Sequence, residues 1–362
     1  MQAFFLFSLR FISIAGTVRG NLCLMKSVPK KILIIRFSSI GDIVLTTPVI
    51  RCLKQQLNTA EIHYLTKKQY QPVLSENPYI DRFWFYENGF GNLLPLLRRE
   101  RFDFIVDLHK NLRSFYIRMN LGVHGASFPK LNLQKWLLVR FGINLMPDLH
   151  IVDRYFRAVS GLGIFNDGSG LDYVIPRSDL LAVEDLPEHF RKGFFAVVIG
   201  GKHSTKIFPA SKVAEVVGKL NKPVILLGGP EDRKRGDDIT IACRDRAWNG
   251  CGIYNLNQSA SLIGLSEAVL TNDTGLMHIA AALNKPVVSV WGNTVPAFGM
   301  FPCRQSGSTA PSVIMEVSGL KCRPCSKLGF NQCPKKHFRC MNDISSEAVA
   351  GALNGIIGGR RV

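Results

Sequence analysis

The feature that most constrains the fold is the alternation of short apolar runs with amphipathic segments in two separate blocks of the chain. In the first block, strands are expected at 31–37, 61–67, 80–86 and 103–109, with helices at 43–57, 70–78 and 93–102. In the second, strands at 194–201, 223–229, 268–273 and 286–292 alternate with helices at 210–220, 230–245, 259–268 and 275–284. Such alternation is typical of parallel sheets covered by helices. The sequence therefore predicts an α/β protein with two doubly wound, Rossmann-like halves that face each other across a cleft.

A length of 362 residues suits two domains. The stretch 164–185 is rich in Gly, Asp and Ser, which favours a connection between them. We expect an N-terminal Rossmann-like domain at 25–170, a linker at 171–185 and a C-terminal Rossmann-like domain at 186–344. Residues 345–362 are expected to contain a C-terminal helix.

The first 24 residues, "MQAFFLFSLRFISIAGTVRGNLCL", differ from the rest. Their apolar run is interrupted by Arg10, is too short for a membrane span and lacks the basic start of a signal peptide. One interpretation makes Met25 the true start, and the other makes 1–24 a membrane-surface anchor. Without a signal peptide we expect a cytoplasmic protein whose nine cysteines are mostly reduced.

The formal net charge of +18 and the pI near 9.7 indicate anionic partners. The sequence contains no RNP1 run, no C2H2 finger and no heptads behind a basic region, so nucleic acid is not the expected partner. Phosphorylated metabolites and membrane lipids remain.

The stretch "RFSSIGD", residues 36–42, reads as the end of a strand, a tight polar turn and the start of a helix. Asp42 stands beside Gly41 in this turn. A carboxylate here either caps the helix or takes part in chemistry.

A second turn of this kind lies in "VLTNDTGLMHIAAALN". A strand ends at Asn272 and Asp273, and a helix begins after Thr274. Its free N–H groups and partial positive charge suit a pyrophosphate, and His278 on the first turn can reach the same ligand. The alternative is structural: Asp273 and Thr274 cap the helix, and His278 is a buried donor.

Together, "RFSSIGD…TTP" and "NDTGLMHIAAA" resemble glycosyltransferase family 9, the ADP-heptose:lipopolysaccharide heptosyltransferases. The resemblance runs through most of residues 30–344. Further matching pieces are "DLHKNLRS" (107–114), "HIVDRY" (150–155), "KIFP" (206–209), "LLGGPED" (226–232) and "CRPC…CP…H…CM" (322–341). The resemblance implies a GT-B fold, with the acceptor in the N-terminal domain, the nucleotide sugar in the C-terminal domain and the reaction in the cleft.

The family's roles are carried over where residues match. Asp42 corresponds to the general base, Lys206 to a lysine at the donor phosphates, and Glu231 to a contact with the nucleoside. The remaining donor-binding residues that the resemblance implies are Ser38, Ser39, Gly41, Asp273, Thr274, Gly275 and His278. The chain departs from the family at "GGKHST", where members of the family often have a Thr pair before the lysine.

The implied reaction is an inverting, metal-independent transfer of a heptose from ADP-heptose to a lipopolysaccharide core acceptor. It would take place at the cytoplasmic face of the inner membrane, with the enzyme in peripheral contact with that membrane. No D-x-D triplet occurs in the sequence, which fits catalysis without a metal cofactor. Two alternatives stay open: another nucleotide sugar or acceptor on the same fold, and a binding protein without activity. A binding protein would need the pocket but not Asp42.

The segment "DLHKNLRSFYIR" follows a predicted strand on the acceptor side. Because arginine suits bidentate capture of phosphate or carboxylate, we assign acceptor binding to Asn111 and Arg113. The alternative is a solvated basic face.

Four cysteines have the spacing C-x2-C-x7-C-x6-C, with His337 among them: Cys322, Cys325, Cys333 and Cys340. The C-x2-C pair is good zinc-ligand spacing, but the second pair is wider than in common zinc ribbons. A structural zinc, reduced packing cysteines and redox bridges are the three interpretations.

Overall fold

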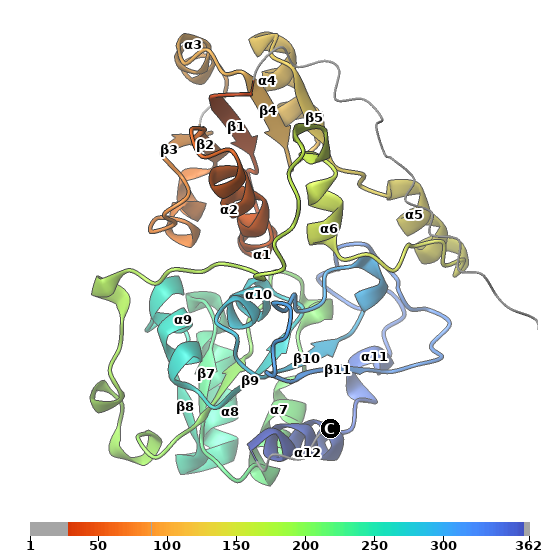
Figure 1. The fold of residues 1–362 in the computed structure, drawn as a ribbon. Helices are drawn as coiled ribbons and strands as arrows, with labels where there is room; N and C mark the ends of the chain where they lie inside the picture. Colours follow the sequence, from red (N-terminus) through yellow and green to blue (C-terminus); the bar gives the residue numbers. More distant parts are fainter. Residues whose placement is uncertain (1–27, 88, 358–362) are drawn as a thin grey trace, which may run out of the picture.

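The computed structural model describes residues 28–87 and 89–357 (Figure 1). The predicted N-terminal extension at 1–24 lies outside these residues, as do the last five residues of the predicted C-terminal segment. No helix in the described ranges is long and apolar enough to cross a membrane.

The N-terminal half is built on a five-stranded parallel sheet with the order β3-β2-β1-β4-β5. Its strands are β1 Lys31–Ile35, β2 Glu61–Thr66, β3 Arg82–Phe85, β4 Phe104–Asp107 and β5 Gly125–Ser127. Its helices are α1 Ile40–Val44, α2 Thr47–Gln56, α3 Leu93–Arg99, α4 Leu112–Leu121, α5 Asn132–Phe141 and α6 Ile151–Phe156, with the 3-10 segment η1 Lys68–Val73. In β1, successive side chains alternate between two cores. Ile32 and Ile34 pack with α2 and α6, whereas Leu33 and Ile35 pack with α3 and α4.

The C-terminal half has a six-stranded parallel sheet with the order β11-β10-β9-β6-β7-β8. Its strands are β6 Phe195–Val198, β7 Val224–Leu227, β8 Ala247–Asn249, β9 Ala268–Asn272, β10 Val287–Trp291 and β11 Ser312–Glu316. Its helices are α7 Ala210–Lys219, α8 Arg233–Cys243, α9 Leu256–Leu265, α10 Gly275–Ala282, α11 Arg339–Asn342 and α12 Ser346–Ile357. Its 3-10 turns are η6 Ser204–Lys206, η7 Pro230–Asp232, η8 Arg244–Arg246 and η9 Pro296–Phe298. Helices α7, α8 and α12 cover one face of this sheet, and α9 and α10 cover the other.

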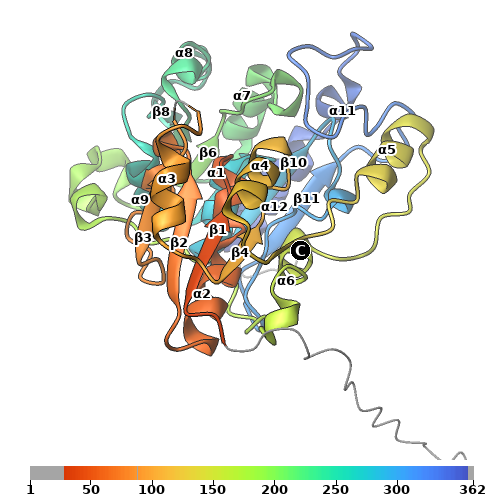
Figure 2. The ribbon, with the colours of Figure 1, turned by 90° about the horizontal axis from the view of Figure 1, so that it is seen from above.

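The two halves share buried contacts. Ala260 of α9, with Ile279 and Ala281 of α10, belongs to the same apolar cluster as the α2 side of the first sheet. Helices α1 and α10 meet where the halves face each other (Figure 1). Seen from above, α5 stands apart from the helices over the first sheet, on the side of α6 and β11 (Figure 2).

The connection between the halves contains the short 3-10 turns η2 Ser160–Leu162, η3 Arg177–Asp179, η4 Val183–Asp185 and η5 Glu188–Phe190. Arg51 of α2, 4% exposed, fixes the first part of it. Its guanidinium pairs with Asp167 at 2.8 Å and with Asp172, and donates to Gly170 O at 2.9 Å. The next part is bonded to the C-terminal half, through Tyr173 Oη to Asn257 Oδ1 at 2.6 Å.

Some local expectations differ from the structure. The helix predicted at 43–57 is broken into α1 and α2, because Pro48 favours a new helix start. The segment predicted as a helix at 70–78 is the 3-10 segment η1, which holds Pro72. The strands β5 and β8, of three residues each, carry too few residues for a readable pattern, and β11 was not predicted either.

Candidate active site

Each sheet changes the direction of its strand order once, and ligands in such folds bind at that point, outside the carboxyl ends of the strands. In the first sheet this point lies between β1 and β4, and in the second between β9 and β6. Asp42 follows β1 and Asp273 follows β9. Both carboxylates therefore stand where an α/β sheet holds its ligand.

Asp42 is held by contacts within its own turn. Its Oδ1 lies 2.7 Å from Arg36 Nη2, and its Oδ2 accepts hydrogen bonds from Ser39 Oγ at 2.8 Å and Ser39 N at 3.2 Å. Ser39 is the N-cap of α1 and Asp42 is its third residue, so the capping role considered from the sequence is present. The Asp42 side chain remains 24% exposed, which leaves a carboxylate edge for a ligand.

Burial alone would raise the pKa of Asp42, but the Arg36 guanidinium and the Ser39 hydrogen bonds lower it below the usual value. Arg36 is fixed in turn, because it donates to Leu108 O, to Ser38 O at 2.8 Å and to Tyr155 Oη at 3.1 Å. Asp42 is thus an ionised carboxylate in a rigid setting.

Asp273 also pairs with a cation. Lys206 Nζ lies 2.5 Å from Asp273 Oδ2, which accepts a second hydrogen bond from Thr294 Oγ1 at 2.9 Å. Thr274 is the N-cap of α10, and Gly275 is the first residue of that helix. The structure brings Lys206 and the start of α10 together, as an anionic diphosphate would require.

Two glycines bring the two turns into contact. A Cβ on Gly41 would lie 2.6 Å from His278 Cδ2 and 3.3 Å from Gly275 Cα, and a Cβ on Gly275 would lie 2.7 Å from Ile40 Cγ2. Side chains at these positions would force the two halves apart. Gly41 and Gly275 therefore allow the helix starts of α1 and α10 to touch.

His278, on the first turn of α10, faces Gly41 of the other half. It is 2% exposed, and among the described residues its Nδ1 has no hydrogen-bond partner. Burial lowers its pKa to about 4, although Asp273 and Asp42 both act to raise it. The ring is therefore neutral at pH 7 and can donate or accept one hydrogen bond through Nδ1.

The other predicted residues are placed as follows. Ser38 lies in the turn before α1, and Glu231 is an exposed residue of η7. Asn111 is the N-cap of α4, and its Oδ1 accepts from Ser114 N at 3.0 Å. Arg113 is exposed, with its guanidinium 5.7 Å from the Tyr86 ring centroid. Asn111 thus has a structural task that the sequence assignment did not foresee.

Sequence reasoning missed polar residues near the predicted site. His109 has a buried Nδ1 without a partner in the described part of the chain, and burial with the charge of Arg36 lowers its pKa to about 3. Both side-chain polar atoms of Asn293, 1% exposed, also lack partners there. His109 lies in "DLHKNLRS", which the sequence singled out, whereas Asn293 lies in the turn after β10, which it did not, and no local pattern marks either residue as unpaired.

The first turn of α6 joins the two halves. Ile151 N donates to Gly299 O at 2.7 Å, His150 Nε2 lies 2.9 Å from Phe301 O, and Arg154 Nη2 donates to Phe298 O at 2.5 Å. Residues 150–155 were recognised only as part of the resemblance. Their contacts hold the 296–301 turn of the C-terminal half against α6.

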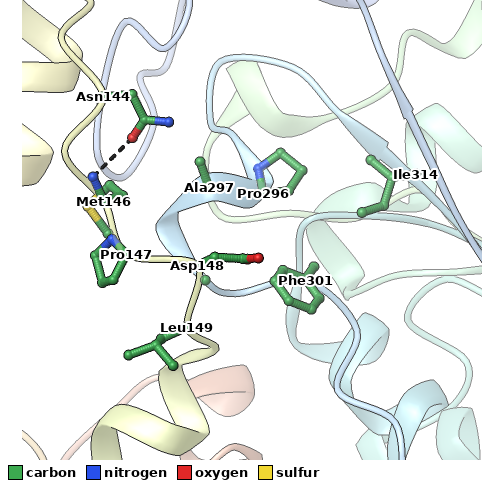
Figure 3. A pocket seen from close by; sticks show the side chains of 10 residues that line it. Asn144, Met146, Pro147, Asp148, Leu149, Pro296, Ala297, Phe301 and Ile314 are labelled. Atoms are coloured by element: carbon green, nitrogen blue, oxygen red, sulfur yellow. Dashed lines mark hydrogen bonds between the residues drawn. The ribbon is translucent and has the colours of Figure 1, made fainter. Parts of the chain in front are cut away.

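The same turn borders a pocket of about 420 Å³. Its other wall is the segment 144–149 after α5, and Figure 3 shows Asp148 of this wall facing Phe301 of the 296–301 turn. Asn144 Oδ1 accepts from Met146 N at 3.0 Å and shapes this segment. None of the predicted site residues lines the pocket.

The four predicted zinc ligands are not arranged as a metal centre. Within the described ranges, no group of three or more His, Cys, Asp or Glu side chains could hold a metal ion. Cys322 Sγ lies 3.7 Å from His337 Nε2, and burial, together with nearby thiols, raises the pKa of Cys340 to about 11. The zinc hypothesis stays a prediction.

Comparison with known proteins adds to this geometry. The sequence model described as glycosyltransferase family 9 (heptosyltransferase) matches residues 92–327. The chain is 26% identical over 360 residues to lipopolysaccharide heptosyltransferase 2 of Escherichia coli K12, covering 90% of this chain and 98% of that one. It is 25% identical to lipooligosaccharide heptosyltransferase 2 of Haemophilus ducreyi, covering 90% and 99%.

Solved structures show the same architecture. A family 9 glycosyltransferase from Veillonella parvula superposes with a TM-score of 0.69 at 20% identity, covering 91% of this chain and 97% of that one. The ADP-heptose lipopolysaccharide heptosyltransferase II of Escherichia coli superposes with a TM-score of 0.67 at 21% identity, covering 91% and 99%. The predicted GT-B fold is therefore confirmed.

Proposed function

Because the chain belongs to glycosyltransferase family 9 (heptosyltransferase) and is a glycosyltransferase, we propose that it transfers a heptose from ADP-heptose to a lipid-linked sugar of the lipopolysaccharide core. The observation that supports this most is the meeting of the Asp42 turn with the Asp273–His278 turn through Gly41 and Gly275. A base and a diphosphate site on opposite halves are what a two-substrate transfer needs.

In the proposed reaction, Asp42 accepts the proton of the acceptor hydroxyl. The acceptor oxygen then attacks the anomeric carbon of the heptose, and the bond from that carbon to the ADP oxygen breaks with its electron pair on ADP. Attack opposite to the leaving group inverts the anomeric centre. A positioned base contributes roughly 10²–10⁴-fold to such a step.

The leaving ADP carries the charge that develops in this step. We assign its stabilisation to Lys206 and to the free N–H groups at the start of α10, without a metal ion. Ser38, Ser39 and Glu231 are assigned to the donor, the last to its ribose hydroxyls. The resemblance supports these roles, and the distances of Lys206 and Thr294 from Asp273 are compatible with them.

The acceptor is proposed to be an anionic lipid-linked sugar, so the reaction belongs at the cytoplasmic face of the inner membrane. A formal charge of +18 favours peripheral contact with an anionic lipid surface.

The direct test is an in vitro transfer assay with ADP-heptose and a panel of truncated lipid A–Kdo acceptors, read by mass spectrometry. We expect a product heavier by one heptose with at least one acceptor of the panel. A thermal-shift screen of ADP-heptose against UDP- and GDP-sugars tests the donor. Larger stabilisation by a UDP- or GDP-sugar would contradict the donor assignment.

A further inference from the structure

Helix α4 carries an apolar face that is largely exposed to solvent. Its four members are spaced i, i+3, i+4 and i+7, and they are Leu112, Phe115, Tyr116 and Met119. Leu112 is 86% exposed, and Tyr116, the least exposed of the four, is 45% exposed. At about 3.6 residues per turn, the four lie on one side of the helix. Ser114 and Ile117 lie on the other side and are buried. We call the four exposed residues the α4 face.

The next helix along the chain, α5, also exposes apolar side chains. Of its ten residues only Leu138 is buried. The exposed large apolar residues of α5 and of the segment that follows it are Leu133, Trp136, Phe141, Ile143 and Leu145. Figure 1 shows α4 at the top of the molecule and α5 at its right. Soluble monomers rarely expose large apolar faces, and such faces mark contact with another molecule or with a membrane.

The stretch that holds both helices is basic and has no acidic residue. Between Asp107 and Asp148, the sequence contains six Lys or Arg residues and no Asp or Glu. Arg118 Nη1 lies 4.0 Å from Asp107 Oδ2, and in the described part of the chain the other five form no ion pair. The helical period places Arg113 and Arg118 on the two flanks of the α4 face. An apolar helix face bordered by basic residues is typical of helices that lie in the surface of an anionic bilayer.

The α4 face begins close to the proposed reaction centre. Strand β4 precedes α4 and pairs with β1, which leads to Asp42. Directly after β4, Leu108 O accepts a hydrogen bond from Arg36, the partner of Asp42. Leu112, the first residue of the α4 face, follows four positions later. A bilayer against α4 would therefore bring the sugar of a lipid-linked acceptor near Asp42 while its lipid stays in the membrane.

We propose that α4 and α5 dock on the surface of an anionic lipid bilayer. The α4 face and the exposed apolar side chains of α5 lie among the lipid headgroups, and the neighbouring Lys and Arg side chains contact the headgroup phosphates. This rests on the proposed function and names the surface for its membrane contact. The charge favours a bilayer over a second copy of the chain. A symmetric dimer through this face would bring two basic surfaces together with no acidic residue to pair them.

Vesicle binding tests the surface without requiring transfer. The full chain is sedimented with vesicles of equimolar phosphatidylcholine and phosphatidylglycerol, and with vesicles of phosphatidylcholine alone. Binding to the anionic vesicles should be about tenfold tighter or more, and added salt should weaken it. Equal binding to the two kinds of vesicle, or binding to neither, would overturn the proposal.

A double variant tests the α4 face. In Phe115→Gln combined with Met119→Gln, the affinity for the anionic vesicles should fall about tenfold or more, because two large apolar side chains are lost from the contact. Glutamine keeps a good helix propensity. The matched control combines Ile241→Gln with Leu328→Gln, two exposed apolar positions of the other half, and should bind like the wild type. Unchanged binding of the α4 variant would overturn the proposal.

Trp136 reports on α5. Lipids brominated in their acyl chains quench tryptophan fluorescence on contact, so anionic vesicles that contain them should quench the wild type more than Trp136→Phe. Arg140→Gln, at an exposed position of α5, should weaken binding about fivefold at low salt, the effect of one basic residue at an anionic surface. Equal quenching of the wild type and Trp136→Phe would overturn the docking of α5.

Transfer assays separate this surface from the proposed function. The α4 double variant should keep transfer to a delipidated, water-soluble acceptor and lose about tenfold in kcat/KM on an acceptor held in vesicles. Vesicle binding that depends on the α4 face, without heptose transfer to any acceptor, would contradict the proposed function and leave the surface standing. Transfer to the soluble acceptor by a protein that binds no vesicles would contradict the surface alone. A dimer that the double variant dissociates, without vesicle binding, would assign the face to a second copy and overturn the proposal.

Discussion

Asp42 and Asp273 occupy corresponding places in the two halves, each after a central strand and each paired with a cation, but the two cations differ. Arg36 is 8% exposed and fixed by three further acceptors, whereas the Lys206 side chain is 18% exposed and its ammonium contacts Asp273. An arginine stays protonated and locked, while a lysine is a mobile point charge. The comparison indicates that the site around Asp42 is preformed for chemistry. Lys206, in contrast, can exchange its contact with Asp273 for a contact with a ligand.

The largest effect is expected from removing the negative charge of Asp42. In Asp42→Asn, kcat should fall about 10²–10⁴-fold, because the acceptor hydroxyl loses its base. The dissociation constant of ADP should change less than twofold, since the residues assigned to its diphosphate, Lys206 and the start of α10, lie in the other half. Single-turnover transfer and calorimetry measure the two quantities. Asp153→Asn, at an exposed position of α6, is the control. If Asp42→Asn turned over nearly as fast as the wild type, Asp42 would not be the base.

The second test disturbs the contact between the two turns. Gly41→Ala places a Cβ 2.6 Å from His278 Cδ2. Overpacking of this kind costs about 1–3 kcal/mol, so kcat/KM should fall roughly five- to a hundredfold and X-ray scattering should show a wider separation of the halves. Gly218→Ala in α7 is the control, because nothing lies within 4 Å of its added Cβ. Unchanged scattering together with full activity would show that the contact is not needed.

The third test removes Lys206, the cation that can exchange Asp273 for a ligand. Lys206→Ala should weaken ADP binding about tenfold, the loss of one charge-assisted hydrogen bond, with a smaller effect on acceptor KM. Calorimetry with ADP measures it. Lys212→Ala, a lysine of α7 whose partner Glu215 is half exposed, should leave ADP affinity unchanged. Equal ADP affinity in wild type and Lys206→Ala would place Lys206 outside the donor site.

The smallest effect concerns pH. Because the pKa of Asp42 lies below its usual value, the carboxylate stays ionised until the pH falls below about 3.9. The acid limb of kcat/KM should lie there, with activity lost as the pH falls through the lowered pKa. Arg36→Met removes the cation and leaves burial, so the pKa of Asp42 rises and the acid limb moves up by about one unit or more. A pH–rate profile that runs from pH 8 to below the acid limb of the wild type shows this, and an unmoved limb would mean that another group controls it.

The sequence predicted the alternation of strands and helices because the spacing of apolar residues and the identity of turn residues are local properties of the chain. It did not predict the break before α2 or the small edge strands, which depend on Pro48 and on neighbours far along the chain. Strand β8, for example, pairs only through residues 224–226 of β7.

For the candidate site, too, the local motifs could be predicted from the sequence and the long-range contacts could not. Asp42 and Asp273 were found from their motifs, because each follows a strand and starts a helix. The pairing of Arg36 with Asp42 and the hydrogen bond of Arg154 to Phe298 O depend on folding, since Phe298 lies 144 positions further along the chain than Arg154. Contacts of that separation leave no trace in a local pattern. The assignment of acceptor binding to Asn111 and Arg113 stays a prediction.

The clamp of Arg51 on the connecting segment has a mechanical consequence. Asp172 N donates to Thr47 Oγ1 at 2.9 Å, which ties the chain to the N-terminal half up to that residue, and Tyr173 is already bonded to Asn257 of the other half. One peptide unit separates the two attachments. Hinges absorb rotation at a few such residues, but Gly168 O also accepts from Ser306 N at 2.7 Å and α6 contacts the 296–301 turn, so the two halves are joined at more than this one place.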